Sequence, residues 1–133
     1  MNGRLVVALS AFGLLMAFAT VWMVPSNVEP AFWLAIFAIC AFFIARFAPG
    51  RHFLHGLGVS LVNCVWITSV HIAFAGEYLA RHPQEAAMMR TMPMPDSPRL
   101  MMAITGPVVG VVSGVVLGLL SWLASKLVKP AAR

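Results

Sequence analysis

Residues 100–125 read LMMAITGPVVGVVSGVVLGLLSWLAS, an uncharged stretch in which glycine recurs at every fourth position from Gly106 to Gly118. As an α-helix this stretch is about 39 Å long, enough to cross the hydrocarbon core of a bilayer with some tilt. The whole chain is 61% hydrophobic and 10% charged over 133 residues. A soluble core of that size cannot enclose so much apolar surface, so the composition predicts an all-α integral membrane protein.

Three further apolar runs precede this one, at residues 5–24, 31–48 and 53–78. None alternates polar and apolar residues with period two, so helices are expected rather than strands of a membrane barrel. The first run continues through Trp22 and Val24 with no polar cleavage region, which favours a retained span over a secretory signal. We therefore predict one domain over residues 1–133, an antiparallel bundle of four transmembrane helices.

The positive charges predict the orientation of the bundle. Six Lys and Arg residues lie at the ends of spans on the side that holds both termini, and three lie in the connection 79–99 on the opposite side. The positive-inside rule then places both termini in the cytoplasm, and the composition is ordinary for a bacterial inner membrane. The net charge of +5 is explained by contact with anionic lipid headgroups, so no nucleic-acid partner is expected. The six residues are Arg4, Arg46, Arg51, Lys126, Lys129 and Arg133, and the three are Arg81, Arg90 and Arg99.

The glycines of the fourth span share one sector of the helix and leave it nearly flat. Transmembrane helices associate by close packing of backbones, so a flat face predicts a helix docked against it. Two partners are open: the small-residue face of the first span in the same molecule, or the fourth span of another copy in a homo-oligomer. The first alternative uses Ser10, Gly13, Ala17 and Thr20, and the docking face itself consists of Gly106, Gly110, Ser113, Gly114 and Gly118.

A stripe of polar side chains runs along the third span. Such groups do not face lipid, and either bond to neighbouring helices or border water. His71 is the ionisable member and is a candidate for proton relay or metal binding, with a neutral ring bonded to a neighbouring helix as the alternative. The stripe consists of Ser60, Asn63, Cys64, Thr68, His71 and Tyr78.

The connection at 79–99 is rich in methionine and proline. Pro83 suits the first turn of a short helix that ends at about Met92. Thioethers are soft ligands that suit Cu(I), so this connection is a candidate copper site; methionine as adaptable packing is the alternative. The candidate ligands are Met88, Met92, Met94 and His82.

No motif predicts catalysis, and the only cofactor that the sequence suggests is Cu(I). Three functions stay open. The first is a self-associating channel or transporter for a small solute or ion, and the second is a scaffold or accessory subunit that binds another membrane protein without transporting anything. The third is the handling of Cu(I) by the outer connection.

Overall fold

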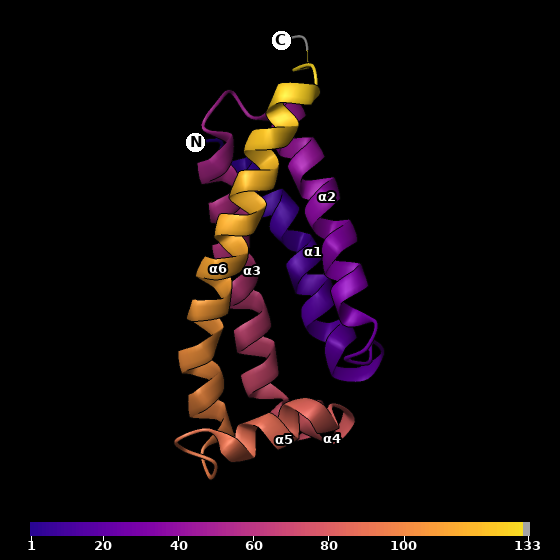
Figure 1. The fold of residues 1–133 in the computed structure, drawn as a ribbon, viewed down its shortest axis with the longest axis vertical. Helices are drawn as coiled ribbons and strands as arrows, with labels where there is room; N and C mark the ends of the chain where they lie inside the picture. Colours follow the sequence, from indigo (N-terminus) through magenta and orange to yellow (C-terminus); the bar gives the residue numbers. More distant parts are fainter. Residues whose placement is uncertain (132–133) are drawn as a thin grey trace.

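The computed structural model describes residues 1–131, and within them the chain is helical without strands. Four of its helices are long and apolar enough to cross a membrane. Two shorter helices lie in the connection between the third and fourth of these spans (Figure 1). The elements are α1 (Gly3–Trp22), α2 (Glu29–Phe47), α3 (His52–Ala73), α4 (Ala75–Arg81), α5 (Pro83–Thr91) and α6 (Pro98–Leu127).

Local signals account for most helix boundaries. The side chain of Asn2 accepts a hydrogen bond from the backbone N–H of Leu5 and so caps α1. Proline stands in the first turn of α2, α5 and α6, where its missing N–H costs nothing. Between α2 and α3 the backbone turns through Gly50, whose φ of 116° is a conformation that favours glycine.

The third span is shorter than the predicted 53–78. The backbone leaves helical geometry at Phe74, with φ −111° and ψ 34°, and α4 then starts in a new direction. Figure 1 shows α4 and α5 lying across the end of the bundle that is remote from both termini. Tyr78, expected on the third span, therefore belongs to α4. The fourth span is longer than predicted and holds Pro107 in its interior.

Helix α3 is the centre of the fold, since it packs against both α1 and α6. Helix α2 packs mainly on α6. Helices α1 and α6 each pack along α3, whereas α2 contacts α6 near the termini and separates from it toward α4 and α5 (Figure 1). The end near the termini is closed by an apolar core that includes Ile44, Val59 and Leu117, all three fully buried.

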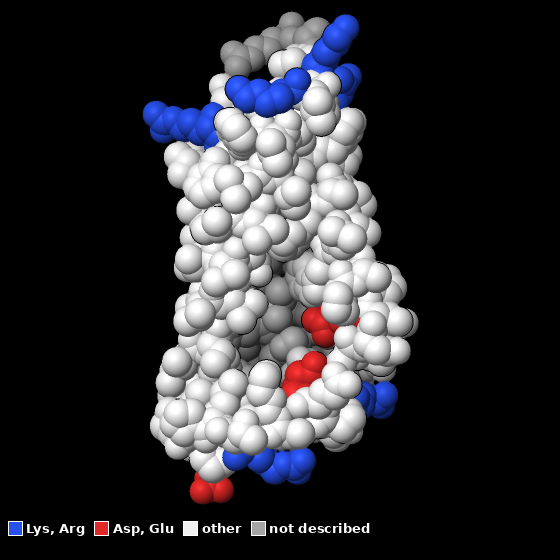
Figure 2. Space-filling view, in the orientation of Figure 1, with Lys and Arg blue, Asp and Glu red and all other residues white. Residues whose placement is uncertain are grey.

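The outward faces of the long helices are apolar. Val7, Leu15 and Val108 are each more than 60% exposed, as expected of side chains that meet lipid rather than water. In Figure 2 the Lys and Arg side chains gather at the two ends, and the belt between them is free of them on the face in view. These features support a helical membrane protein. Arg133, one of the six basic residues used for orientation, lies outside the described residues.

Candidate functional site

The glycine face of α6 docks within the same chain, on α3. A Cβ atom at Gly110 would lie 2.6 Å from the Cβ of Cys64, and one at Gly114 would lie 2.7 Å from Leu57. Near the termini the two backbones touch directly, since a Cβ at Gly56 would lie 2.7 Å from the Cα of Gly118. The face is therefore docked against a helix, but that helix is α3, and neither of the two expected partners occupies it.

The reason lies in α3, which carries its own small residues at four-residue steps. Gly56, Ser60 and Cys64 match the spacing of the α6 glycines, so the two helices can approach closely along most of their length. Ser60 Oγ also donates a hydrogen bond of 3.1 Å to the carbonyl oxygen of Gly110. A homo-oligomer built on the glycine face would have to displace α3, so this face is not free for a second copy.

The small-residue face of α1 packs on another side of α3. Gly13 lies directly against the side chain of Asn63. The hydroxyl of Thr20 lies 2.8 Å from Nε2 of His71, and Trp66 Nε1 donates to Ser10 Oγ at 3.3 Å. The polar stripe of α3 thus divides between two neighbours, with Ser60, Cys64 and Thr68 toward α6 and Asn63 and His71 toward α1.

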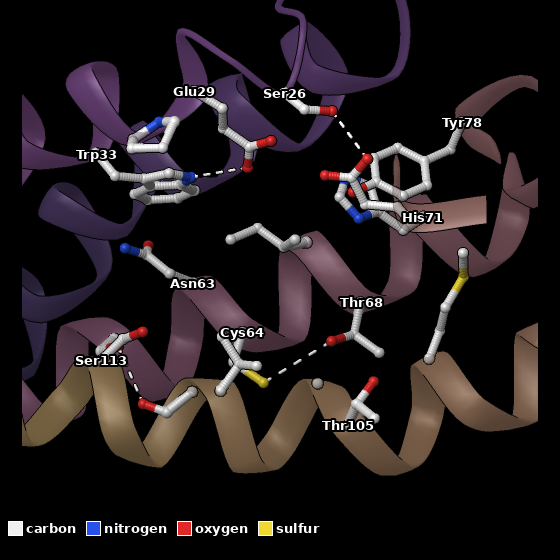
Figure 3. A pocket seen from close by; sticks show the side chains of 18 of the residues that line it. Ser26, Glu29, Trp33, Asn63, Cys64, Thr68, His71, Tyr78, Thr105 and Ser113 are labelled. Carbon is white, nitrogen blue, oxygen red and sulfur yellow. Dashed lines mark hydrogen bonds between the residues drawn. The ribbon is translucent and has the colours of Figure 1, made fainter. Parts of the chain in front are cut away.

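Between α2 on one side and α3 and α6 on the other lies a cavity of about 690 Å³. Figure 2 shows the hollow in the half of the molecule remote from the termini. All six residues of the predicted polar stripe line it, together with Gly106, Gly110 and Ser113 of α6. Figure 3 shows Asn63, Cys64 and Thr68 of α3 bordering the same space as Thr105 and Ser113. The stripe therefore borders a chamber open to small molecules.

Three stacked rings join the end of α3 to α4 at the end of the cavity remote from the termini. The ring of His71 stacks on Tyr78 with centroids 4.1 Å apart, and Tyr78 stacks on His82 at 4.3 Å (Figure 3 shows the first pair). Thr20 directs its hydroxyl hydrogen to a backbone carbonyl of α1, so its oxygen accepts the Nε2–H of His71. That assignment leaves Nδ1 of His71 as a hydrogen-bond acceptor.

Tyr78 remains a neutral phenol in this setting. Burial first, and then the negative charges of Glu29 and Glu85, raise the pKa of Tyr78 above its ordinary range. The phenol lines the cavity. It therefore offers the chamber a hydroxyl rather than a charge.

Two carboxylates border the cavity, and sequence reasoning missed both. Glu29 stands in the first turn of α2 and Glu85 in the first turn of α5. Trp33 Nε1 donates to Glu29 at 3.0 Å, and Ser26 Oγ donates to Glu85 at 2.8 Å. Figure 2 shows acidic side chains at the rim of the hollow. The sequence contained one signal, an acidic residue in the first turn of each of two helices, but it did not indicate that the two residues would border one cavity.

Asn63 carries a buried polar atom that has no hydrogen-bond partner among the described residues. The side chain is 3% exposed, and its Oδ1 is buried with no hydrogen-bond partner among residues 1–131. The amide lines the cavity from α3 (Figure 3). A buried amide oxygen without a partner costs free energy. This oxygen packs against Gly13 of α1, so the cost belongs to the contact between α1 and α3 and the atom is not presented to the cavity.

The candidate copper ligands are placed in different surroundings. Met88 is half-exposed and lines the cavity, whereas Met92 and Met94 pack against the apolar core near α4 and α5. His82 is 1% exposed, and its two ring nitrogens lie 2.8 Å and 3.2 Å from the backbone carbonyl oxygens of Tyr78 and Val24. Its ring nitrogens are thus directed at the backbone. Copper binding by the remaining thioethers stays a prediction.

The chain matches no protein-family model, no curated protein and no solved structure. The functional interpretation therefore depends on the geometry of the cavity.

Proposed function

We propose that the protein is a transporter that carries a small amphipathic molecule across the bacterial inner membrane, with the cavity as its binding site. The observation that carries this proposal is the lining of the cavity by the whole polar stripe of α3 inside a helix bundle with apolar outer faces. Polar groups within a membrane domain are typical of substrate pathways. The volume is also in the range of pockets that hold small organic ligands.

The proposed orientation places both termini in the cytoplasm. Arg4, Arg46, Arg51, Lys126 and Lys129 belong to the end near the termini, which fits the positive-inside rule. The closed apolar core then lies toward the cytoplasm and the cavity lies in the outer half of the membrane. In Figure 2 the cavity opens on the side of the bundle, and α4 and α5 lie across the proposed outer end (Figure 1).

A transport cycle also requires the helices to move, and α6 contains a position at which a helix can bend. Gly106 lines the cavity, and the next residue, Pro107, removes one backbone hydrogen bond from the interior of α6. Proline in a long helix is a common position of bending. The bend would lie at the depth of the cavity, where opening and closing must be coupled to the substrate.

Flux into proteoliposomes tests the proposal. The solutes are benzyltrimethylammonium, phenyl glucoside and benzenesulfonate, which share an aromatic ring and differ in charge. We expect protein-dependent uptake of at least one solute, and we expect Ser113→Phe, which fills the cavity from α6, to abolish it. A variant of the polar stripe, His71→Ala, should lower the same uptake because it removes a cavity wall group that anchors α3 to α1.

Ser125→Phe is the matched control, because Ser125 lies on the same helix but outside the cavity. It should leave uptake unchanged. Uptake equal to that of protein-free liposomes for all three solutes would contradict transport and would favour the accessory role. Normal uptake by Ser113→Phe would show that the cavity is not the route.

A further inference from the structure

We propose that the ligand of the cavity is an organic cation with an apolar body, held by Glu29 and Glu85. This inference rests on the proposed function only in using the same cavity. It adds the chemical class of the ligand, which the polar stripe alone does not indicate.

The charge of the cavity is the first argument. Its lining contains Glu29 and Glu85 and, within residues 1–131, no lysine or arginine. The hydrogen-bond partners of the two carboxylates are the neutral side chains of Trp33 and Ser26. These donors each engage one oxygen and leave the negative charges without a protein counter-ion. A low-dielectric chamber with two such charges attracts a cation strongly.

The walls indicate that the cation is organic. Trp33, Leu34, Phe37 and Val109 give the chamber a large apolar and aromatic surface beside the carboxylates. Hard metal cations need six or more oxygen ligands at short distance, and this lining does not gather them. An ammonium group attached to an apolar body satisfies both kinds of wall, since the rings of Trp33 and Tyr78 can also face a cation.

The remaining polar groups of the chamber wall include hydroxyl and thiol groups. Thr68 and Cys64 of α3 and Thr105 of α6 border the same space, on different elements from either carboxylate. The buried Oδ1 of Asn63 is not presented to this space, because it packs against Gly13 of α1. A molecule that fills the chamber therefore meets an acidic rim beside hydroxyl and thiol groups.

Equilibrium binding to the detergent-solubilised protein tests the assignment. Benzyltrimethylammonium, phenyl glucoside and benzenesulfonate are titrated separately by calorimetry. We expect the cation to bind at least about tenfold more tightly than either of the other two, because only the cation gains from the two carboxylates. Equal or tighter binding of the neutral or anionic probe would overturn the assignment without any variant.

Isosteric variants locate the charge. Glu29→Gln and Glu85→Gln should each weaken cation binding by about tenfold and leave the binding of phenyl glucoside unchanged. Glu77→Gln is the matched control, because Glu77 is an exposed acid of α4 outside the cavity. If Glu77→Gln weakened binding as much as the cavity variants, a diffuse surface effect would explain the data and the assignment would fail.

The two proposals fail in different ways. If a neutral or anionic solute is both bound and transported, the transporter stands and the cation assignment is wrong. If the cation binds as expected but no solute is transported, the ligand class stands and the transport function is wrong.

Discussion

The direct contact of two backbones at Gly56 and Gly118 leads to a sharp prediction about stability. Substituting Gly56 by alanine adds one methyl group at the point where α3 and α6 meet. That methyl carbon would lie 2.7 Å from both the Cα and the N of Gly118, whereas ordinary contacts are 3.4–4 Å. The obstructing atoms are backbone, so no side-chain rotation can make room, and the two helices must separate.

The size of the effect follows from that geometry. Relief of the clash needs a shift of about 0.7 Å or more, and a gap of that size forfeits roughly a quarter to a half of the dispersion energy of each contact that opens. Overpacking of this kind costs about 1–3 kcal/mol. Alanine is a better helix former than glycine by about 1 kcal/mol, which offsets part of the loss. We expect Gly56→Ala to lower the free energy of unfolding by about 1–2 kcal/mol.

Gly58→Ala is the matched control on the same helix. A Cβ at Gly58 would lie 3.6 Å from a methyl group of Val6, which is ordinary contact. This variant should therefore be neutral or slightly more stable than the natural protein. The assay is reversible unfolding in mixed detergent micelles, followed by far-ultraviolet circular dichroism. Equal stability of the two variants, or a loss confined to Gly58→Ala, would refute the direct backbone contact between α3 and α6 at Gly56 and Gly118.

Three further predictions concern single groups. Tyr78, the one tyrosine of the chain, should stay neutral as pH rises past about 10 in the folded protein. Because the folded protein raises the pKa of Tyr78, the contribution of the neutral phenol to stability is complete below that pH and is lost as pH rises further. Near-ultraviolet titration of folded and denatured protein checks this, and coincident curves would contradict it. Cys64, which lines the cavity, should react with N-ethylmaleimide faster than fully buried Cys40, with the sites read by mass spectrometry; preferential labelling of Cys40 would be incompatible with the cavity. Calorimetric titration with Ag(I), a Cu(I) mimic, tests the methionines of the connection 79–99. Packing methionines should take up no Ag(I), whereas stoichiometric uptake would support the copper site.

Sequence reasoning predicted those features that depend only on residues close together in the chain. The four apolar spans follow from periodicity and composition. The same patterns singled out the glycine face and the polar stripe without identifying what each would contact. The bend at Phe74 was missed because a continuous apolar run does not reveal where a helix changes direction. The docking partner of the glycine face was missed although Gly56, Ser60 and Cys64 repeat the same four-residue spacing in α3.

The composition of the cavity rim could not be predicted, because its parts come from distant positions. Glu29 and Glu85 belong to different helices, and only the crosswise course of α4 and α5 brings them to one chamber. A sequence pattern reports which face a residue takes on its own helix. It does not report where two short connections will place the first turns of α2 and α5.

The cavity itself follows from an uneven distribution of glycine among the helices. Close approach is possible where α3 meets α6, through Gly56 and Gly110, and where α3 meets α1, through Gly13. Helix α2 has no glycine and presents Trp33 and Phe37 to the chamber, so it cannot close against α3 in the same way. Both carboxylates stand on α2 and α5, the elements that make no glycine contact with α3. A cation bound between Glu29 and Glu85 would therefore connect α2 and α5, the two helices that make no close glycine contact with α3. Binding energy between loosely packed helices can shift the equilibrium between two conformations of the bundle.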